Sequence, residues 1–373
     1  MDPKLYRAAM GGKEKMGGEE NEKNDDDVLY LMQCINDQQQ LELQLISNKN
    51  TVLHVAAQFG NQKYVQIILE KSPSSSLLRC LNIDGETPLQ IVARVGHLDI
   101  VKALIQCAKR LDHEEVESGG GAAMEMLRAT NKDNDTALHI AVRNPRNSGV
   151  LKDIEFIRPP NNAGVVEWLT KEDPEFTHPP NNAKETPLYL ASERQRNDMV
   201  SMILKNCTSP ANGGPKGQTA LHTAAKSSKL LLEWKSDLIK EIDEYGWTPL
   251  HYVAHHGNVN GVKRILEKDK SVAYITTDEE DDEKTALHIA AARGNVRVME
   301  ELLSQCPDCW EMKGIEGNTP PLYLLITAFG IDMPMFGIVL WAHSTGDWNA
   351  TNNNNVTPQG IMWSRVAEVR MLI

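Results

Sequence analysis

Several features that would quickly assign a sequence to a functional class are missing from this 373-residue chain. A basic excess is absent, since 39 lysines and arginines stand against 51 aspartates and glutamates and the net charge is −12. An acidic chain without a basic stripe is poorly suited to binding phosphates, so we expect no nucleic-acid partner. The first residues, "MDPKLYRAAMGG", have neither the layout of a secretory signal nor the second-position glycine of a myristoylation site.

Closely spaced cysteines are nearly absent. Of the six cysteines only Cys306 and Cys309 lie near each other in sequence, which favours a reducing compartment over a disulfide framework. Their string, "CPDCW", is open to two chemical interpretations, a redox dithiol or half of a zinc site. No second Cys-x-x-Cys completes a zinc site and no βαβ pattern surrounds this one, so we interpret both cysteines as structural.

Motifs of catalysis and cofactor binding are missing as well. The sequence has no H-E-x-x-H, P-loop, dinucleotide-binding glycine pattern, kinase signature or G-x-S-x-G. We therefore predict a protein that is not an enzyme, with no catalytic residues, no bound metal and no small-molecule cofactor. The one enzymatic alternative is a dithiol oxidoreductase that uses Cys306 and Cys309.

A repeated string dominates the sequence instead. Clear copies begin at Thr51 with "TVLHVAAQFG", at Thr248 with "TPLHYVAHHG" and at Thr285 with "TALHIAAARG". Further copies begin at Thr87, Thr136, Thr186 and Thr219, and weaker ones begin at Thr319 and Thr357. Turn-rich segments such as "NIDGE" and "DEYGW" precede the threonines, because Gly, Asn and Asp tolerate the positive φ of tight turns.

Each copy predicts two short helices. The threonine can cap the first helix, and a glycine nine residues later, as at Gly60 and Gly257, can end it. Apolar residues three and four positions apart follow, such as Val65, Ile68 and Leu69, which predicts an amphipathic second helix. One repeat cannot bury this apolar face alone, so neighbouring repeats must stack into a continuous core.

These strings resemble the ankyrin repeat, whose signature is T-P-L-H-x-A. The resemblance implies an all-α helical solenoid with short β-finger turns, made of about seven good repeats and atypical terminal caps. It also implies that the signature histidines are structural and bridge neighbouring turns by hydrogen bonds. These histidines are His54, His139, His222, His251 and His288.

The repeat register divides the chain into three regions. Residues 1–46 are expected to form a partial repeat or cap with an acidic loop, residues 47–314 the array, and residues 315–373 degenerate repeats or a cap. Irregular spacing predicts a surface-loop insertion near 111–123, a second insertion near 145–160 and a shortened unit at 215–243, whose second helix should be distorted or shortened. In the same register Cys306 and Pro307 mark the end of a second helix.

Two unusual segments allow more than one interpretation. The run "DEEDDE" at Asp278–Glu283 falls in a finger and is interpreted as solvated acids, with binding of a divalent cation or a basic partner as the alternative. The apolar stretch Pro320–Ala342 is interpreted as a buried helix pair, because Asp332 and Pro334 interrupt it. Its alternative is a face toward lipid or a partner.

A narrower resemblance rests on "MDPKLYRAA", "EYGWTPLHYVAHHGN", "TALHIAAARGNVRVMEELL" and "CPDCWE". These strings are similar to plant ankyrin proteins of the accelerated-cell-death type. That family implies a cytosolic array followed by a multi-span membrane domain, and a role in defence, cell death or stress signalling. The sequence departs from the family because no apolar run of bilayer length follows the last repeat.

The ankyrin resemblance also implies where a partner binds. Members present a concave surface of finger tips and first helices, with variable contacts one and three residues before the threonine and seven and eight after it. Aromatic and arginine side chains are the usual anchors of interfaces. The predicted partner-binding residues are Tyr245, Trp247, His255 and His256 in the densest group, with Phe59, Arg94, Arg194 and Arg293 elsewhere. For Trp247 the alternative is packing between adjacent fingers.

The sequence therefore predicts a cytoplasmic interaction scaffold that binds a protein or peptide segment in plant defence, cell-death or stress signalling. The alternative is the cytosolic part of a regulator at the cytosolic face of a membrane. Membrane association rests on the family resemblance alone.

Overall fold

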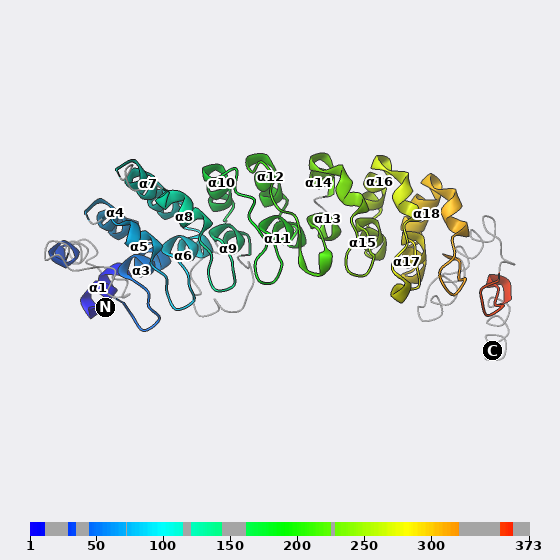
Figure 1. The fold of residues 1–373 in the computed structure, drawn as a ribbon, viewed down its shortest axis with the longest axis horizontal. Helices are drawn as coiled ribbons and strands as arrows, with labels where there is room; N and C mark the ends of the chain where they lie inside the picture. Colours follow the sequence, from blue (N-terminus) through cyan, green and yellow to red (C-terminus); the bar gives the residue numbers. More distant parts are fainter. Residues whose placement is uncertain are drawn as a thin grey trace, which may run out of the picture. The chain divides into compact units, whose positions relative to one another are not determined.

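The structure is a computed structural model that describes residues 1–11, 29–34, 45–71, 73–114, 121–143, 162–224, 228–320 and 351–360. The chain divides into two compact units, which we call unit 1 (residues 1–191 and 198–212) and unit 2 (residues 192–197 and 213–373). Each unit consists of helix pairs joined by turns (Figure 1). Across the described residues β-structure is limited to one isolated bridge, between Gly213 and Thr219, which confirms the helical fold class.

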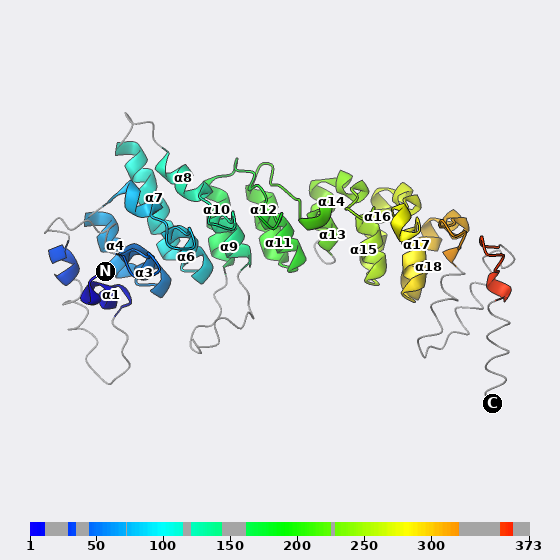
Figure 2. The same ribbon diagram turned by 60° about the horizontal axis from the view of Figure 1, so that its bottom comes forward.

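Unit 1 has two rows of helices. The first helices of its repeats form one row, and the second helices form another, which is the upper row in Figure 1; Figure 2 shows the same two rows from another side. The first row is α1 (Pro3–Ala9), α3 (Val52–Phe59), α6 (Pro88–Val95), α9 (Ala137–Arg143) and α11 (Pro187–Glu193). The second row is α4 (Gln62–Lys71), α7 (Leu98–Glu114), α10 (Ala163–Glu172) and α12 (Asn197–Asn206), and α5 (Ser75–Arg79) and α8 (Ala122–Arg128) lie in the links.

Unit 2 repeats this arrangement with shorter links. Its first helices are α13 (Ala220–Thr223), α15 (Pro249–His255) and α17 (Ala286–Ala292). Its second helices are α14 (Ser228–Trp234), α16 (Val259–Lys268) and α18 (Val296–Gln305). The connecting 3-10 turns are η4 (Pro215–Gly217), η5 (Ser236–Lys240), η6 (Lys270–Tyr274), η7 (Glu279–Asp281) and η8 (Pro307–Glu311).

The signature residues start and stop the first helices as predicted. Thr51 is the N-cap of α3, and its hydroxyl accepts a hydrogen bond from the His54 backbone N–H. Gly60 ends this helix with φ 72°, a left-handed conformation that costs glycine little. Thr87 and Gly96 do the same for α6, with Pro88 at the first helical position.

The irregular repeats differ from the sequence expectation in one place. The insertion expected as a surface loop near 111–123 is partly helical, because α7 continues to Glu114 and α8 begins at Ala122. In the unit predicted to be shortened, the described part of the second helix, α14, has 7 residues, directly after the undescribed residues 225–227, and the first helix α13 has 4. The insertion near 145–160 lies outside the described residues.

The core consists of the apolar positions that the repeat pattern predicted. Val65 and Ile68 of α4 and Val262 and Ile265 of α16 are fully buried. Each second helix therefore buries one face against its first helix and its neighbours, and stacking hides apolar area that a single repeat would expose to water.

Cys306 and Cys309 belong to this core. Cys306 follows directly after α18 and Pro307 opens η8, so the predicted helix end is confirmed. Cys309 is 0 % exposed, and burial raises its pKa to about 12. A thiol with so high a pKa is a poor nucleophile, which supports the structural interpretation of the pair.

The apolar stretch Pro320–Ala342 lies outside the described residues beyond Pro320 itself. Within the parts of the chain that the structure describes, none of the helices has both the length and the apolar character needed to cross a bilayer.

Candidate functional site

A ladder of signature side chains connects the first helices α3, α6, α9, α13, α15 and α17 to the fingers that follow them. The Nε2 atom of His54 donates to the backbone oxygen of Glu86 at 3.0 Å, and the same atom of His251 donates to Lys284 at 3.2 Å. The other bonds of this kind run from His139 to Glu185, from His222 to Trp247 and from His288 to Asn318. The predicted structural role of these histidines is thereby confirmed.

The ladder histidines are neutral. The Nδ1 atom of His288 accepts a hydrogen bond from the Thr285 backbone N–H at 3.1 Å, so the ring proton is on Nε2, where it is donated. Burial lowers the pKa of His288 to about 4, and it lowers the pKa of His54, His139 and His251 to about 4 as well. In the Thr87 repeat Gln90 takes the place of histidine and donates to Asp135 O at 2.9 Å.

An Asn or Asp holds most of the fingers. The Oδ1 atom of Asn82 accepts from the backbone N–H groups of Asp84 and Glu86, both at 2.9 Å. Asp243 does the same for Tyr245 and Trp247, again at 2.9 Å. This side chain satisfies backbone donors that have no partner in a strand, and it thereby fixes the direction in which the residues before the threonine point.

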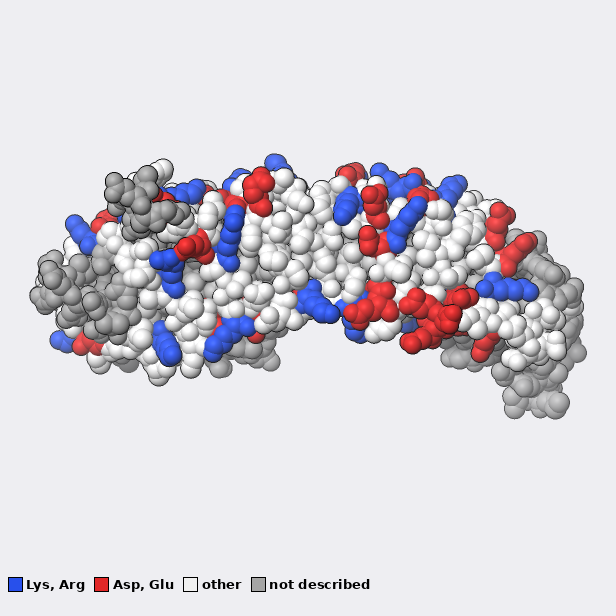
Figure 3. Space-filling view, in the orientation of Figure 1, with Lys and Arg blue, Asp and Glu red and all other residues white. Residues whose placement is uncertain are grey.

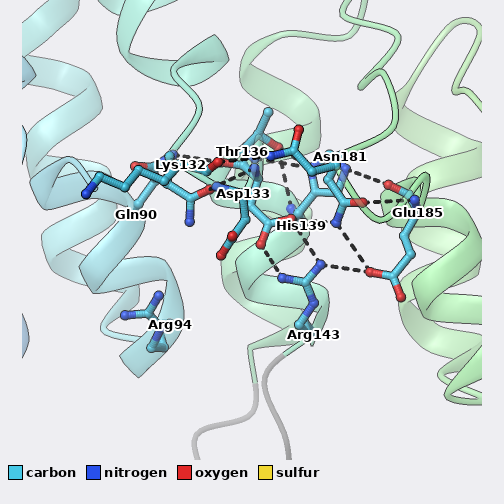
Figure 4. A network of polar contacts seen from close by, with 12 residues as sticks. Gln90, Arg94, Lys132, Asp133, Thr136, His139, Arg143, Asn181 and Glu185 are labelled. Carbon is cyan, nitrogen blue, oxygen red and sulfur yellow. Dashed lines mark hydrogen bonds and ion pairs between the residues drawn. The ribbon is translucent and has the colours of Figure 1, made fainter. Parts of the chain in front are cut away.

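In two repeats of unit 1, those of Thr87 and Thr136, the predicted contact positions are occupied by ion pairs. Arg143, seven residues after Thr136, pairs with Asp135, one residue before it, and its Nη2 atom also lies 2.9 Å from Glu185 Oε2 in the next finger (Figure 4). The side chain of Asp135 is 2 % exposed, and Asn181 Nδ2 donates to it at 2.7 Å. Arg94 pairs with Glu86 in the same register.

In unit 2 the same two positions form an aromatic group. Trp247 lies one residue before Thr248 and His255 seven residues after it, and their ring centroids are 5.7 Å apart. The Tyr252 ring meets Trp247 edge-on at 5.1 Å, and its hydroxyl donates to Asp243 Oδ2 at 2.7 Å. Trp247 is half-buried, and its indole Nε1 donates to Asp281 Oδ2 of the next finger at 2.7 Å.

The other predicted residues of the dense group lie around this one. The His256 ring is 4.9 Å from that of His255, and an Arg293 Nη2 hydrogen bond reaches His255 Nε2 from α17. Burial, with Arg293 and His256 beside it, lowers the pKa of His255. Tyr245, 47 % exposed, lies under the ammonium of Lys216, whose Nζ atom is 5.2 Å from the ring centroid. We call Tyr245, Trp247, Tyr252, His255, His256 and Arg293 the aromatic face.

The remaining predicted residues do not join the aromatic face. Phe59 ends α3 and is 47 % exposed. Arg94 is held by Glu86, and Arg194 is exposed in the turn after α11. Sequence reasoning missed Arg143, although the same register that selected Arg94 points to it. Tyr252, four residues after its threonine, had no such signal.

The finger before Thr285 differs from the others in length. In the Thr248 repeat the closing bond runs from Asp243 N to Trp247 O, four residues on, whereas here it runs from Thr277 N to Lys284 O, seven residues on. The three extra residues carry acids, with η7 at their centre and Asp282 and Glu283 at positive φ. We call residues 278–283 the acidic finger. An acidic patch lies at the lower edge of unit 2 in Figure 3.

No arrangement for metal binding accompanies this face. Within the described ranges, no group of three or more His, Cys, Asp or Glu side chains is placed to hold a metal ion. The described geometry is a surface on which aromatic, cationic and anionic side chains contact one another, and such a surface is suited to binding another macromolecule.

Comparison with known families agrees with the repeat architecture. A model of ankyrin repeats (3 copies) matches residues 19–115, 74–154, 160–238, 214–276 and 228–313. These matches cover more than half of the chain, so it belongs to the ankyrin-repeat family. Members of this family typically serve as protein-interaction modules, and the fold here is of that kind.

Individual relatives are distant. The Arabidopsis thaliana protein ACCELERATED CELL DEATH 6 is 26% identical over 65% of this chain and 35% of its own length. Ankyrin repeat protein nuc-2 of Neurospora crassa is 26% identical over 68% of this chain and 21% of its own length. SMC5-SMC6 complex localization factor protein 1 of Bos taurus is 28% identical over 42% of this chain and 15% of its own length. The matched part thus spans a third or less of most of these relatives.

One solved structure is similar to part of the chain. The ankyrin repeat domain of Bcl-3, described as a member of the IkappaB protein family, has 23% sequence identity to this chain and a TM-score of 0.47. The match covers 64% of this chain and 94% of that one.

Proposed function

We propose that the protein is a non-enzymatic scaffold that binds a protein or peptide segment through the aromatic face of unit 2. The observation that supports this most is the half-buried Trp247, which joins one finger to the next through Asp281 and still keeps part of its ring accessible. Tyr245 is exposed beside it. Preorganised aromatic side chains with partners of their own lose little conformational entropy on binding, so they are suited to anchor a partner.

The alternative role of Trp247, packing between fingers, is compatible with this proposal. Its hydrogen bond to Asp281 fixes the ring, and fixing the ring prepares it for a partner. The edge contacts with Tyr252 and His255 act in the same way, since they support the ring from within the repeat.

A crosslinking experiment tests the proposal. A photo-reactive crosslinker placed near the aromatic face should capture partner proteins from an extract of the cells that express the chain. The double change Tyr245→Ala with Trp247→Ala should remove most of that captured material, because it removes both anchors. The control Tyr274→Ala, at a 36 % exposed tyrosine in η6, should leave capture unchanged. Capture that survives the double change in a folded protein contradicts the proposal.

We place this scaffold in the cytoplasm, in plant defence, cell-death or stress signalling. The support is the likeness to ACCELERATED CELL DEATH 6, which covers 65% of this chain. Association with the cytosolic face of a membrane rests on that likeness as well. Fractionation of tissue with an antibody to the array tests it: recovery in the membrane pellet supports the association, and recovery in the supernatant contradicts it.

A further inference from the structure

We infer that the partner of the aromatic face is a basic protein segment, whose lysine or arginine side chains contact the acidic finger while an adjacent apolar residue packs against Trp247. This inference rests on the proposed function and adds the chemical class of the partner. It is carried by the charge of the residues around the aromatic rings, by a cation already held there, and by the contrast with unit 1.

The charge beside the rings is strongly negative. The finger before Thr248 has Asp243 and Glu244, and the acidic finger contributes six more carboxylates. Between residues 277 and 284 the only basic side chain is Lys284, and its Nζ atom lies 2.9 Å from Asp281 Oδ1. Asp278, Glu279 and Glu280 are exposed. A cationic segment would be attracted to this edge, and an acidic one repelled.

The acidic finger and the aromatic rings form one continuous surface. Trp247 Nε1 donates to Asp281 Oδ2 at 2.7 Å, and Asp278 N donates to Tyr245 O at 3.3 Å. The finger is therefore held against the Tyr245–Trp247 turn by bonds at both of its sides. A partner that covers Trp247 must lie within reach of these carboxylates.

The face already holds one cation in the way that we infer for the partner. Lys216 reaches across from the preceding finger and places its ammonium 5.2 Å from the Tyr245 ring centroid. Its pKa is raised by the Tyr245 side chain first, with smaller effects from Glu244 and Asp243. A cation over an aromatic ring with carboxylates beside it is the arrangement that a basic segment could extend toward Trp247.

In unit 1 the carboxylates directly before the threonines are arranged differently. Glu86 and Asp135 are buried and paired with Arg94 and Arg143. Because each of these two carboxylates is already paired with an arginine, its charge is neutralised and attracts a further cation only weakly. The preference for a basic partner is therefore a property of the aromatic face and its acidic finger. Changing the charge of the acidic finger tests this preference directly.

Binding of a defined peptide tests the inference directly. The probe is a fluorescein-labelled synthetic peptide in which arginines alternate with serines around a central leucine, measured by fluorescence anisotropy against the full chain. Matched peptides carry glutamine or glutamate in place of arginine. The arginine peptide should bind best and should bind less tightly as salt rises. Equal binding of the glutamine peptide would overturn the inference.

Variants then locate the binding. Glu279→Lys with Glu280→Lys should weaken the arginine peptide by about tenfold, since two exposed attractions become repulsions. Glu267→Lys with Glu300→Lys makes the same charge change on the second helices α16 and α18, at exposed positions, and should change affinity by less than about twofold. Equal weakening by both pairs would mean that only the net charge matters and would overturn the inference.

The same variants separate this inference from the proposed function. If Tyr245→Ala with Trp247→Ala removes crosslinked partners but Glu279→Lys with Glu280→Lys does not, the face binds a partner that is not basic. If neither double change affects capture, both the face and its partner class are wrong. If both changes remove the same partners and the arginine peptide competes with them, both proposals hold.

Discussion

The contact positions flanking the signature threonine hold opposite chemistry in the Thr136 repeat of unit 1 and the Thr248 repeat of unit 2. In the Thr87 and Thr136 repeats of unit 1 an arginine seven residues after the threonine pairs with an acid just before it, as Arg143 does with Asp135. In unit 2 the same positions hold His255 and Trp247, in edge contact at 5.7 Å. The first arrangement satisfies itself and the second leaves aromatic surface exposed. The same repeat backbone can thus present paired ionic side chains in one repeat and exposed aromatic surface in another.

The largest expected effect is a loss of stability at low pH, which comes from the buried ladder histidines that both units contain. Burial lowers the pKa of His54, His139, His251 and His288 to about 4, below the 6.5 of an unfolded histidine. The unfolded chain therefore binds protons first, so each histidine's contribution is complete above pH 6.5 and is lost as pH falls toward 4. At pH 5 the loss is about 2 kcal/mol per histidine.

Hydrogen exchange at pH 7 and pH 5, read separately in each unit after correction for the intrinsic rate, measures this loss. The control is His251→Gln with His288→Gln. Glutamine already serves at Gln90, whose Oε1 accepts from Thr87 N at 2.8 Å, so the change keeps the bonds and removes the titration. Unit 2 should then lose about 4 kcal/mol less at pH 5, while unit 1 is unaffected. An unchanged pH response would contradict the ladder assignment.

The next largest expected effect is the loss of stability when a ladder histidine is replaced by alanine. His288→Ala at pH 7 should destabilise unit 2 by about 3 kcal/mol, because it opens a cavity and leaves the Asn318 carbonyl without its ladder donor. His139→Ala should cost unit 1 a similar amount. Chemical denaturation of each variant measures this. A much smaller loss in one unit would show that the ladder does not support both units alike.

Breaking a charged pair tests the feature that is specific to unit 1. Arg143→Met should cost about 2 kcal/mol, since it leaves the buried Asp135 carboxylate without its cation, and the 32 % exposure of Arg143 keeps the value below that of a fully buried pair. Arg94→Met should cost about half as much, because Arg94 is 51 % exposed and its pair with Glu86 is therefore more strongly screened by water. Denaturant midpoints give both values. Lys171→Met, at an exposed pair on α10, is the control and should have little effect.

The smallest expected difference concerns the fingers. At Gly246 (φ +70°) an added Cβ would lie 2.6 Å from the backbone N of Asp278, so Gly246→Ala should cost about 2 kcal/mol and move the acidic finger. At Gly294 (φ +66°) nothing lies within 4 Å, so Gly294→Ala should cost about 1 kcal/mol, from backbone strain alone. Thermal denaturation measures the difference. Equal losses of stability in the two variants would show that the acidic finger can move away from an added Cβ at little cost in free energy.

The fold could be predicted from the sequence because its determinants are local. A threonine cap, a glycine nine residues on and apolar residues at helical spacing each act within one repeat, and Thr51, Gly60 and Val65 lie where that pattern places them. The exceptions follow from the same logic. The string after Leu111 contains glycines and acids typical of a loop, yet α7 continues to Glu114 because nothing before the glycines stops a helix.

The candidate site was less accessible to sequence reasoning, because it depends on contacts between repeats. The register selected Trp247, His255 and Arg293, and the structure places them together. It could not reveal that Asp281 reaches back to the Trp247 indole, because that contact requires the three-residue extension of the finger. Whether these residues bind a partner stays a prediction that the crosslinking experiment tests.

The ladder also has a consequence for how such a chain can change over generations. Each ladder donor ends on a backbone oxygen, one residue before the next threonine, and the residues that supply it are Glu86, Asp135, Glu185, Trp247, Lys284 and Asn318. A backbone acceptor is the same whatever side chain the residue has. The ladder bond therefore does not depend on which side chain stands before the threonine, and residues as different as Glu86, Trp247 and Lys284 occupy that position while the bond is kept.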